Sequence, residues 1–319
     1  MTPLPIATRT SPLAMAQTRM VQAALGAAQG FDSVETDRAF PIVGMSTTGD
    51  QIQDRALLAA GGKGLFTQEL EAALMDGRVA FAVHSMKDVP TRLPDGLVIA
   101  AMMEREDPSD VLLTRDGAAT LADLPQGAKL GTASIRRQAQ ALHQRPDLQI
   151  SLLRGNVDTR LAKLESGAVD ATFLAKAGLK RLGRPQGALP GMDLSAMLPA
   201  VGQGAVGIEL KADNGAAVAA LAPLNHLDTQ LAVTAERAFL DALDGSCRTP
   251  IAAYGQREDD DHFLLKGEVY SPDGARAWSR SIRIILGQDP LASVREAGYA
   301  MGRDLKAEGG AALIQALAP

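Results

Sequence analysis

Residues 79–90 read Val-Ala-Phe-Ala-Val-His-Ser-Met-Lys-Asp-Val-Pro, and this stretch decides the class of fold. Its first half, Val79–His84, is a short apolar run of the kind found in buried strands of parallel sheets. The polar residues that follow place Asp88 at the carboxyl end of that strand, where open α/β sheets bind their ligands. A carboxylate there can stabilise a cation or move a proton. The same residues also fit an ordinary loop aspartate paired with Lys87, and a structural role for His84.

The N-terminal half surrounds this run with short apolar strands that alternate with helical patterns, which is typical of an α/β sheet. Ser11 and Pro12 have the residue types of a helix N-cap and first helical position, and the helical pattern runs to Gly30. The polar, glycine-containing stretch 45–64 predicts a long mobile loop, a lid that carries Lys63. The remaining predictions are strands at Leu4–Thr8, Phe40–Gly44 and Leu97–Met102, and a helix at Leu65–Met75.

A second α/β unit follows the polar segment Glu104–Asp110. Its predicted strands are Val111–Thr114, Lys129–Gly131, Gln149–Leu153 and Ala171–Leu174, and its predicted helices are Ile135–His143, Val157–Glu165 and Ala177–Leu182. The glycine-rich stretch Leu198–Gly207 then looks like a crossing back to the first unit. From Asp228 the pattern changes to that of a small α+β domain. This domain has predicted helices near Thr229–Leu243 and Leu291–Ala307, and strands at Ile251–Tyr254, His262–Tyr270 and Arg276–Ile285. We therefore expect three domains: 1–104 with 203–224, 105–202, and 225–319.

The composition excludes several classes of protein. A net charge of -5, a pI of about 5.5 and an aromatic content of 3% argue against nucleic-acid binding. No apolar run approaches the roughly 20 residues of a membrane span, and the N-terminus lacks the pattern of a secretion signal. We therefore expect a cytoplasmic protein without membrane or nucleic-acid partners. Cys247 is the single cysteine and there are four histidines, so an intrachain disulfide is excluded and no metal site is expected.

Positive charge is concentrated between Lys129 and Arg184, which carry 11 Lys and Arg against 4 Asp and Glu, a net charge of +7. Because the whole chain has a net charge of -5, the rest of it carries -12 (-5 minus +7). A basic segment in an acidic protein predicts an anionic ligand. Phe173 is the only aromatic residue in the segment, so a small polycarboxylate or phosphate is favoured over stacked bases.

Five arginines occur at predicted strand ends or helix starts: Arg9, Arg136, Arg137, Arg154 and Arg160. A cation at a helix N-terminus is unfavourable against the helix dipole, and an anion bound between the guanidinium and the helix amides would remove that conflict. These arginines therefore predict an anion site, with a solvated basic face as the alternative.

Cys247 lies in Asp244–Pro250, where glycine, serine and proline predict an exposed loop. The neighbouring Arg248 favours the thiolate form of the cysteine. Burial as a small hydrophobic residue is the alternative.

Together these stretches resemble the porphobilinogen deaminase, or hydroxymethylbilane synthase, family. The resemblance covers nearly the whole chain, and its motifs occur in family order. They are Ile6–Ala14, Gly61–Phe66, His84–Pro90, Glu104–Pro108, Gly131–Arg137, Leu153–Arg160, Ala177–Leu182, Leu198–Ile208 and Gly245–Pro250. It implies an α/β protein with two domains like type II periplasmic binding proteins, a small C-terminal α+β domain, and a monomeric state.

The resemblance also implies an activity: four porphobilinogen molecules condense head to tail with loss of four ammonia, and hydrolysis releases linear hydroxymethylbilane. A dipyrromethane cofactor, bound through a thioether to Cys247, primes the chain. The resemblance makes Asp88 the catalytic residue. The other cofactor-binding residues are Lys87, Thr132, Ser134, Arg136, Arg137 and Arg154, and the substrate-binding residues are Arg9, Ser11, Lys63, Arg154, Arg160, Arg181 and Gln203.

The chemistry of the substrate agrees with these assignments. Each pyrrole carries an acetate and a propionate, so a growing chain needs several arginines to hold it. Some positions depart from the commonest family pattern without removing a catalytic residue: Ala59, Ala133, Lys176 and Ser246. Two other classes of function stay open, a non-catalytic anion-binding protein and a transferase that uses Cys247 as its nucleophile.

Overall fold

The computed structural model describes residues 2–51, 64–245 and 249–317, and the chain folds into two compact units. The first unit comprises Met1–Glu106 and Gly204–Gln230, and the second comprises Asp107–Gln203 and Leu231–Pro319. The chain therefore leaves the first unit, builds part of the second, returns to the first and leaves it again.

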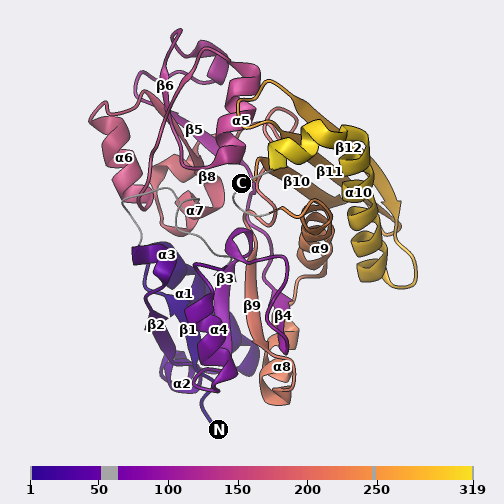
Figure 1. The fold of residues 1–319 in the computed structure, drawn as a ribbon. Coiled ribbons are helices and arrows are strands. Elements are labelled where there is room, and N and C mark those ends of the chain that lie inside the picture. The colour runs from indigo at the N-terminus through magenta and orange to yellow at the C-terminus, as the bar shows by residue number, and fades with distance from the viewer. Residues whose placement is uncertain (1, 52–63, 246–248, 318–319) are drawn as a thin grey trace. The chain divides into compact units, whose positions relative to one another are not determined.

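A five-stranded mixed sheet forms the centre of the first unit (Figure 1). The strand order is β2-β1-β3-β9-β4, in which β1 is parallel to β2 and β3. The strand β9 is antiparallel to both of its neighbours, β3 and β4, and it comes from the segment that returns to this unit. The strands are β1 (Ile6–Arg9), β2 (Ile42–Met45), β3 (Phe81–Ser85), β4 (Leu97–Met102) and β9 (Val206–Lys211).

Different helices cover the two faces of this sheet, because alternate strand residues point to opposite faces. Ile6 packs with Val21 of one helix, whereas the next residue, Ala7, packs with Leu70 of another. The helices of this unit are α1 (Pro12–Gln29), α2 (Ser33–Ala39), α3 (Thr48–Gln51), α4 (Gln68–Met75) and α8 (Gly215–Leu221), with short 3₁₀ turns η2 (Met86–Asp88) and η5 (Ala222–Leu224).

The predicted start and end of α1 are confirmed. The Ser11 hydroxyl accepts a hydrogen bond from the amide of Ala14, which satisfies one of the free amides at the helix start. Pro12 costs no hydrogen bond at the first helical position. Gly30 ends the helix in the left-handed conformation (φ 71°), which glycine adopts without steric cost. Arg9, the last residue of β1, therefore stands just before a helix start.

The second unit contains a four-stranded sheet of order β5-β8-β6-β7. The strands β6, β7 and β8 are parallel where they pair, and β5 is antiparallel to β8. Because β6 leads into α5 and β7 leads into α6, these two helices begin at the same edge of the sheet. The elements are β5 (Asp110–Thr114), β6 (Lys129–Gly131), β7 (Gln149–Ser151), β8 (Ala171–Ala175), α5 (Ile135–Gln144), α6 (Val157–Glu165), α7 (Lys176–Arg181), η3 (Leu121–Asp123) and η4 (Pro185–Ala188).

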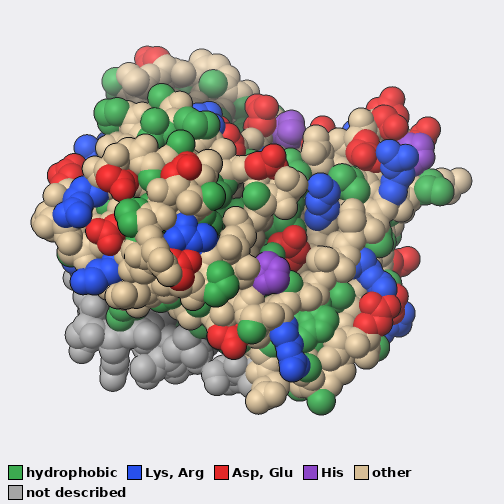
Figure 2. All heavy atoms as spheres, turned by 90° about the horizontal axis from the view of Figure 1, so that it is seen from above, with side chains coloured by type: hydrophobic (Ala, Val, Ile, Leu, Met, Phe, Trp, Pro, Cys, Tyr) green, Lys and Arg blue, Asp and Glu red, His purple; other side chains and the backbone are tan. Residues whose placement is uncertain are grey.

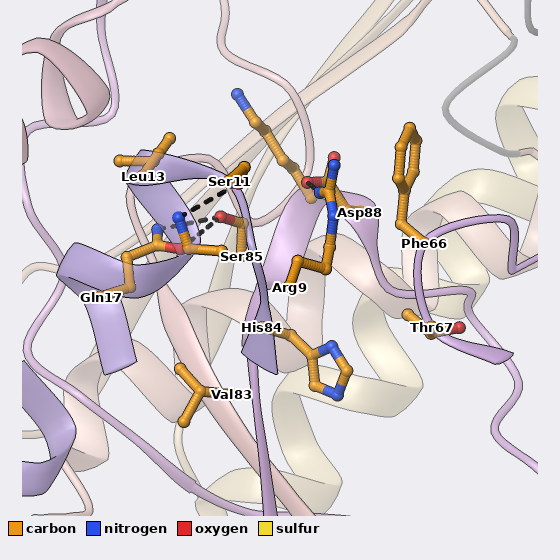
Figure 3. A pocket seen from close by; sticks show the side chains of 12 residues that line it. Arg9, Ser11, Leu13, Gln17, Phe66, Thr67, Val83, His84, Ser85 and Asp88 are labelled. Atoms are coloured by element: carbon orange, nitrogen blue, oxygen red, sulfur yellow. Dashed lines mark hydrogen bonds and ion pairs between the residues drawn. The ribbon is translucent and has the colours of Figure 1, made fainter. Parts of the chain in front are cut away.

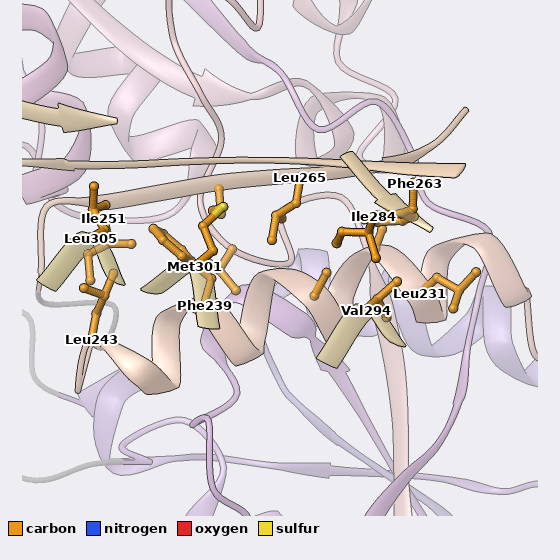
Figure 4. Packing of buried hydrophobic residues seen from close by; sticks show 14 of the residues in the cluster. Leu231, Phe239, Leu243, Ile251, Phe263, Leu265, Ile284, Val294, Met301 and Leu305 are labelled. Carbon is orange, nitrogen blue, oxygen red and sulfur yellow. The ribbon is translucent and has the colours of Figure 1, made fainter. Parts of the chain in front are cut away.

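The C-terminal part of the second unit is a three-stranded antiparallel sheet packed against two helices. Figure 4 shows the core between them, where Phe239, Met301 and Leu265 meet. The elements are α9 (Leu227–Ala242), β10 (Ile251–Arg257), β11 (His262–Tyr270), β12 (Ala277–Ile285) and α10 (Pro290–Leu317). These three sheets confirm the predicted fold class of two α/β parts and a small α+β part.

Several elements differ from the sequence predictions. The predicted loop 45–64 is wrong at Thr48–Gln51, which form α3, and α8 was not predicted. The helix α2 was missed, although Asp32 and Glu35 form a capping box that marks its start. The predicted crossing Leu198–Gly207 extends too far, because β9 already begins at Val206. No helix in the described ranges is long and apolar enough to cross a membrane.

Candidate active site

Two neighbouring parallel strands of the first unit end beside one pocket. The strand β1 ends at Arg9, and β3 continues into η2, which contains Lys87 and Asp88. Their carboxyl ends present these side chains at the same edge of the sheet. The pocket there has a volume of about 450 Å³, part of which is open solvent. Four predicted site residues, Arg9, Ser11, Lys87 and Asp88, line it.

Arg9 makes ionic contacts in this pocket, and Figure 3 shows it beside Asp88. Its Nε donates to Oδ2 of Asp50 at 3.0 Å, and its Nη2 donates to Oδ1 of the same carboxylate. Its Nη1 lies 3.8 Å from Oδ2 of Asp88. The Cζ atom of Arg9 lies 4.2 Å from the ring centroid of Phe66, which is a cation–π contact. The structure thus brings together Arg9 and Asp88, and it adds Asp50, which no local sequence pattern indicates.

The Arg9–Asp50 pair shifts the pKa of both groups toward their charged forms. Burial of the Asp50 carboxyl would raise its pKa, but hydrogen bonds from Arg9 and Thr47 outweigh burial and hold it below its usual value. Burial opposes the charge on Arg9 as well, yet its hydrogen bond to Asp50 and the charges of Asp88 and Asp50 raise its pKa. Both members of the pair are therefore ionised at neutral pH.

A buried pair of polar side chains, His84 and Glu209, lies on the face of the sheet that α4 covers, and His84 also lines the pocket. Nε2 of His84 lies 2.8 Å from Oε2 of Glu209 on β9, and these side chains are 4% and 0% exposed. Burial is the main cause that raises the pKa of the nearby Glu71, and the charge of Glu209 adds to it. One carboxylate oxygen of Glu71 and one of Glu209 are buried and have no hydrogen-bond partner in the part of the chain that the structure describes. His84 is therefore anchored in the pocket wall, as the structural interpretation expected.

In the second unit, the buried carboxylate of Asp110 holds two predicted cofactor ligands. Nη2 of Arg136 donates to it at 2.7 Å, and Arg137 donates through Nε at 3.1 Å and through Nη2 at 2.7 Å. Nε2 of Gln203 also donates to it, at 2.8 Å. Burial would raise the pKa of Asp110, but the two guanidinium charges outweigh burial and hold it far below its usual range. Two arginines and one carboxylate leave this buried group with an excess of positive charge.

Arg136 is buried and is bound by the protein itself as well as by Asp110. Its Nη1 donates to the carbonyl of Leu198 at 2.7 Å, and the residue is 4% exposed. Its Nε is buried and has no hydrogen-bond partner among the described residues, so one donor of this guanidinium is unsatisfied. Asp110 was missed, because it precedes an apolar strand and nothing in the local sequence shows that it faces two arginines.

Three predicted arginines form a positively charged group at the starts of α5 and α6. Burial, together with the charges of Arg137 and Arg154, lowers the pKa of Arg160 to about 10. Nε of Arg160 donates to the carbonyl of Gly155 at 2.9 Å. Mutual repulsion of this kind is unfavourable unless an anion binds there. An anion bound at this group would reduce that repulsion.

Two further predicted residues of the second unit, Thr132 and Ser134, lie at the start of α5. Ser134 caps α5 through the amide of Arg137 at 3.4 Å, and its own amide donates to the hydroxyl of Thr132 at 3.0 Å. Arg181 is the last residue of α7. Lys63, Ala59, Ser246 and Cys247 lie outside the described residues.

The molecular face in Figure 2 shows Lys and Arg side chains interspersed with Asp, Glu and apolar side chains. Within residues 2–51, 64–245 and 249–317, there is no cluster of three or more side chains of the types His, Cys, Asp or Glu that could hold a metal ion.

The family models and the curated relatives that match this chain carry the same description, porphobilinogen deaminase. Residues 4–219 match the family model "Porphobilinogen deaminase, dipyromethane cofactor binding domain", and residues 230–306 match "Porphobilinogen deaminase, C-terminal domain". The chain is 50% identical over 316 residues to the porphobilinogen deaminase of Phenylobacterium zucineum, with 97% of each chain covered. It is 49% identical over 317 residues to that of Caulobacter vibrioides, with 98% of each covered.

Solved structures resemble the chain more distantly. One is the periplasmic aliphatic sulphonate binding protein SsuA of Escherichia coli, at 14% identity and a TM-score of 0.42, covering 99% of this chain and 92% of that one. Another is the second substrate binding domain of a putative amino acid ABC transporter from Streptococcus pneumoniae. Its identity is 15% and its TM-score 0.42, covering 75% of this chain and 94% of that one.

Proposed function

The chain belongs to the porphobilinogen deaminase family, and from this membership we propose that it is the transferase hydroxymethylbilane synthase. The reaction condenses four porphobilinogen molecules head to tail, releases four ammonia molecules, and frees linear hydroxymethylbilane by hydrolysis. The observation that carries the proposal is the pairing of Asp88 with Arg9 at the strand ends in the pocket. Both residues lie inside the segment that matches the cofactor-binding domain of the family.

Asp88 is the proposed catalytic residue. Loss of ammonia from porphobilinogen leaves an electron-deficient methylene-pyrrole, and a fixed carboxylate nearby stabilises the positive charge that develops. The Asp88 side chain is 32% exposed, so a substrate in the pocket can reach it. Its contact with Arg9 orients it, and its position after β3 is set by the strand. Lys87, Ser11 and Lys63 complete the proposed substrate and cofactor contacts of the first unit.

The proposed carboxylate ligands are the arginines at strand ends and helix starts. Arg9 serves the first unit, and Arg137, Arg154 and Arg160 serve the second. The proposal is supported by the lowered pKa of Arg160, whose cause after burial is repulsion by Arg137 and Arg154. A ligand with two carboxylates per ring would neutralise this repulsion, and arginine binds each carboxylate at two points. Arg181, Thr132 and Ser134 are proposed to add hydrogen bonds.

These residues also fit the dipyrromethane cofactor that the family contains. The excess positive charge around Asp110 and the unsatisfied Nε of Arg136 are what a bound polycarboxylate would compensate. The carboxylates of the cofactor would be held by Arg136, Arg137 and Arg154. Gln203 would keep Asp110 in place. Cys247 would bind the cofactor covalently through a thioether. When bound, the cofactor supplies the pyrrole on which the product chain is started.

Other aspects of the protein follow from the same proposal. We propose a cytoplasmic monomer that acts on a small molecule and has no membrane or nucleic-acid partner. We also propose that it consists of three domains, 1–104 with 203–224, 105–202, and 225–319.

The test is to incubate the purified protein with porphobilinogen and to measure ammonia, hydroxymethylbilane and the intact mass of the protein. We expect four ammonia molecules per product and a resting mass above the 33.4 kDa of the sequence. Binding of porphobilinogen without release of ammonia would favour a non-catalytic anion-binding protein instead. An unmodified Cys247 in active resting protein would favour a transferase with a free cysteine nucleophile.

A further inference from the structure

Asp50 binds the guanidinium of Arg9 as a ligand carboxylate would. Nε and Nη2 of Arg9 donate to the two oxygens of Asp50, which is the two-point geometry in which arginine recognises carboxylates. The third nitrogen, Nη1, faces Asp88 at 3.8 Å. A ligand carboxylate that binds Arg9 at the same two points must therefore replace Asp50.

Asp50 is kept at the pocket by contacts that do not involve Arg9. The hydroxyl of Thr47 donates to Oδ2 of Asp50 at 2.7 Å, and the amide of Asp50 donates to the carbonyl of Thr47 at 3.0 Å. Thr47 is itself fully buried. These hydrogen bonds would remain if the carboxylate of Asp50 released Arg9, so Asp50 has an alternative partner when a ligand arrives.

The segment that carries Asp50 is also fixed to the start of α4. The amide of Gly49 donates to the carbonyl of Leu65 at 2.8 Å, and a Cβ at position 49 would lie 2.3 Å from the ring of Phe66. The amide and hydroxyl of Thr48 both donate to Glu69, at 2.8 and 2.7 Å. Asp50 is thus held where it competes for Arg9 at high local concentration.

The pair is accessible enough for exchange. The Arg9 and Asp50 side chains are 20% and 23% exposed, so water and a ligand can reach both. Because both side chains reach solvent, another carboxylate can replace Asp50 at Arg9 without unfolding of the unit.

We propose that Asp50 is an internal competitor for the substrate carboxylates at Arg9 and thereby sets the affinity of the pocket for porphobilinogen. The proposed function supplies the identity of the ligand here, and the geometry supplies the competition. While Asp50 occupies Arg9, only a fraction of the molecules can bind a carboxylate, and the apparent affinity falls by that fraction. The exchange transfers two hydrogen bonds of Arg9 from one carboxylate to another and breaks no covalent bond.

The test compares Asp50→Asn with the wild-type holoenzyme, because asparagine keeps the shape of aspartate but removes its charge. The probe is a pyrrole that bears acetate and propionate but no aminomethyl group, so that it binds without reacting. Isothermal titration calorimetry should give a dissociation constant about two- to fivefold lower for Asp50→Asn, the range expected for a partly exposed ion pair.

Asp76→Asn is the matched control. Asp76 is an exposed carboxylate of the same unit, paired with Arg78, and its replacement also removes one negative charge. The dissociation constant of the probe should be the same for Asp76→Asn as for the wild type. Equal tightening in Asp76→Asn would assign the effect to net charge and overturn the proposal.

Two further results would also overturn it. Unchanged or weaker probe binding by folded Asp50→Asn would mean that Asp50 orients Arg9 rather than competes for it. Equal tightening by Glu69→Ala, which removes the acceptor of both Thr48 hydrogen bonds but keeps the Asp50 charge, would mean that loosening of the segment is the cause. Asp50→Ser provides the same test if melting shows that the asparagine variant is unfolded. Failure of the wild type to consume porphobilinogen would instead contradict the proposed function, and the probe comparison would still be interpretable.

Discussion

Asp88 and Asp110 are both carboxylates beside arginine, but their surroundings give them different tasks. The Asp88 side chain is 32% exposed and lies 3.8 Å from Arg9, so it is loosely paired and can reach a ligand. The Asp110 side chain is fully buried and accepts hydrogen bonds from two arginines and a glutamine. A partly hydrated carboxylate can act on a substrate, whereas a buried and fully paired one holds other side chains in place.

We expect Asp88→Asn to lose most turnover while the fold is retained. Asparagine keeps the shape of the side chain but lacks the charge that opposes the cationic intermediate, and loss of one such group typically costs about 10²–10³ in rate. The measurement is porphobilinogen consumption, with a melting curve as the control for folding. Normal turnover by a normally folded variant would contradict the assignment of Asp88.

We expect Asp110→Asn to destabilise the second unit strongly. Removal of one member of a buried ionic group leaves the other charges uncompensated, which costs about 3–5 kcal/mol. Urea unfolding measures the change in the free energy of unfolding. The matched control is Asp76→Asn, an exposed pair for which a change of about 0–1 kcal/mol is expected. Equal effects of the two replacements would mean that the Asp110 group adds no special stability.

The same carboxylate predicts a dependence of stability on acid. The pKa of Asp110 is far lower in the folded protein than in the unfolded chain, where it is about 3.9. The unfolded chain therefore binds more protons below about pH 4, and acid favours unfolding. The contribution of Asp110 is fully present above about pH 5 and is lost as the pH falls. The free energy of unfolding should depend less steeply on pH between about 4 and 3 in Asp110→Asn, and parallel curves would contradict this.

At the scale of elements, the close approach of α10 to α9 depends on glycine. A Cβ at Gly298 would lie 2.4 Å from the carbonyl oxygen of Ala235, and one at Gly302 would lie 2.7 Å from that of Phe239. Both neighbours are backbone atoms of a helix, which cannot move aside as a flexible side chain can. The packing distance between the two helices is therefore set by the absence of side chains at these positions.

We expect Gly298→Ala to destabilise the protein by about 1–3 kcal/mol, the usual cost of overpacking a core. The matched control is Gly215→Ala at the start of α8, where a Cβ meets no atom of the described residues within 4 Å. That replacement should be neutral or stabilise by up to about 1 kcal/mol, because alanine restricts the unfolded chain more than glycine. Equal thermal shifts in the two variants would refute the close-packing argument.

At the scale of the whole molecule, local patterns predict the elements better than they predict the partners. The strand at Leu97–Met102 and the helix at Val157–Glu165 are found with the predicted bounds. Their signals, the spacing of apolar residues and the capping residues, lie within the segments themselves. The positions of Arg9 and Asp88 at strand ends were predicted in the same way, whereas their contact is seen only in the structure. Asp50 and Asp110 could not be found in this way, because their importance lies in which side chains they face across the fold.

Removal of the proposed cofactor should lower the stability of the whole protein. A group that binds only the folded state stabilises it, and here it would also relieve repulsion around Arg160. Cys247→Ser should have the mass of the sequence and a melting temperature several degrees below that of the holoenzyme. Wild-type protein made without a supply of porphobilinogen is the control for the mutation itself. Equal melting temperatures of the loaded and unloaded wild type would contradict the prediction.

The position of β9 in the sheet also has a consequence for biosynthesis. This strand pairs with β3 and β4, yet β4 ends at Met102 and β9 begins only at Val206. At a translation rate of about 5–20 residues per second, a ribosome needs about 5–20 seconds to make the intervening segment. During that interval the facing edges of β3 and β4 have no strand between them, and unpaired edges are sites of aggregation. The nascent first unit therefore has a period in which two unpaired strand edges can pair with other chains.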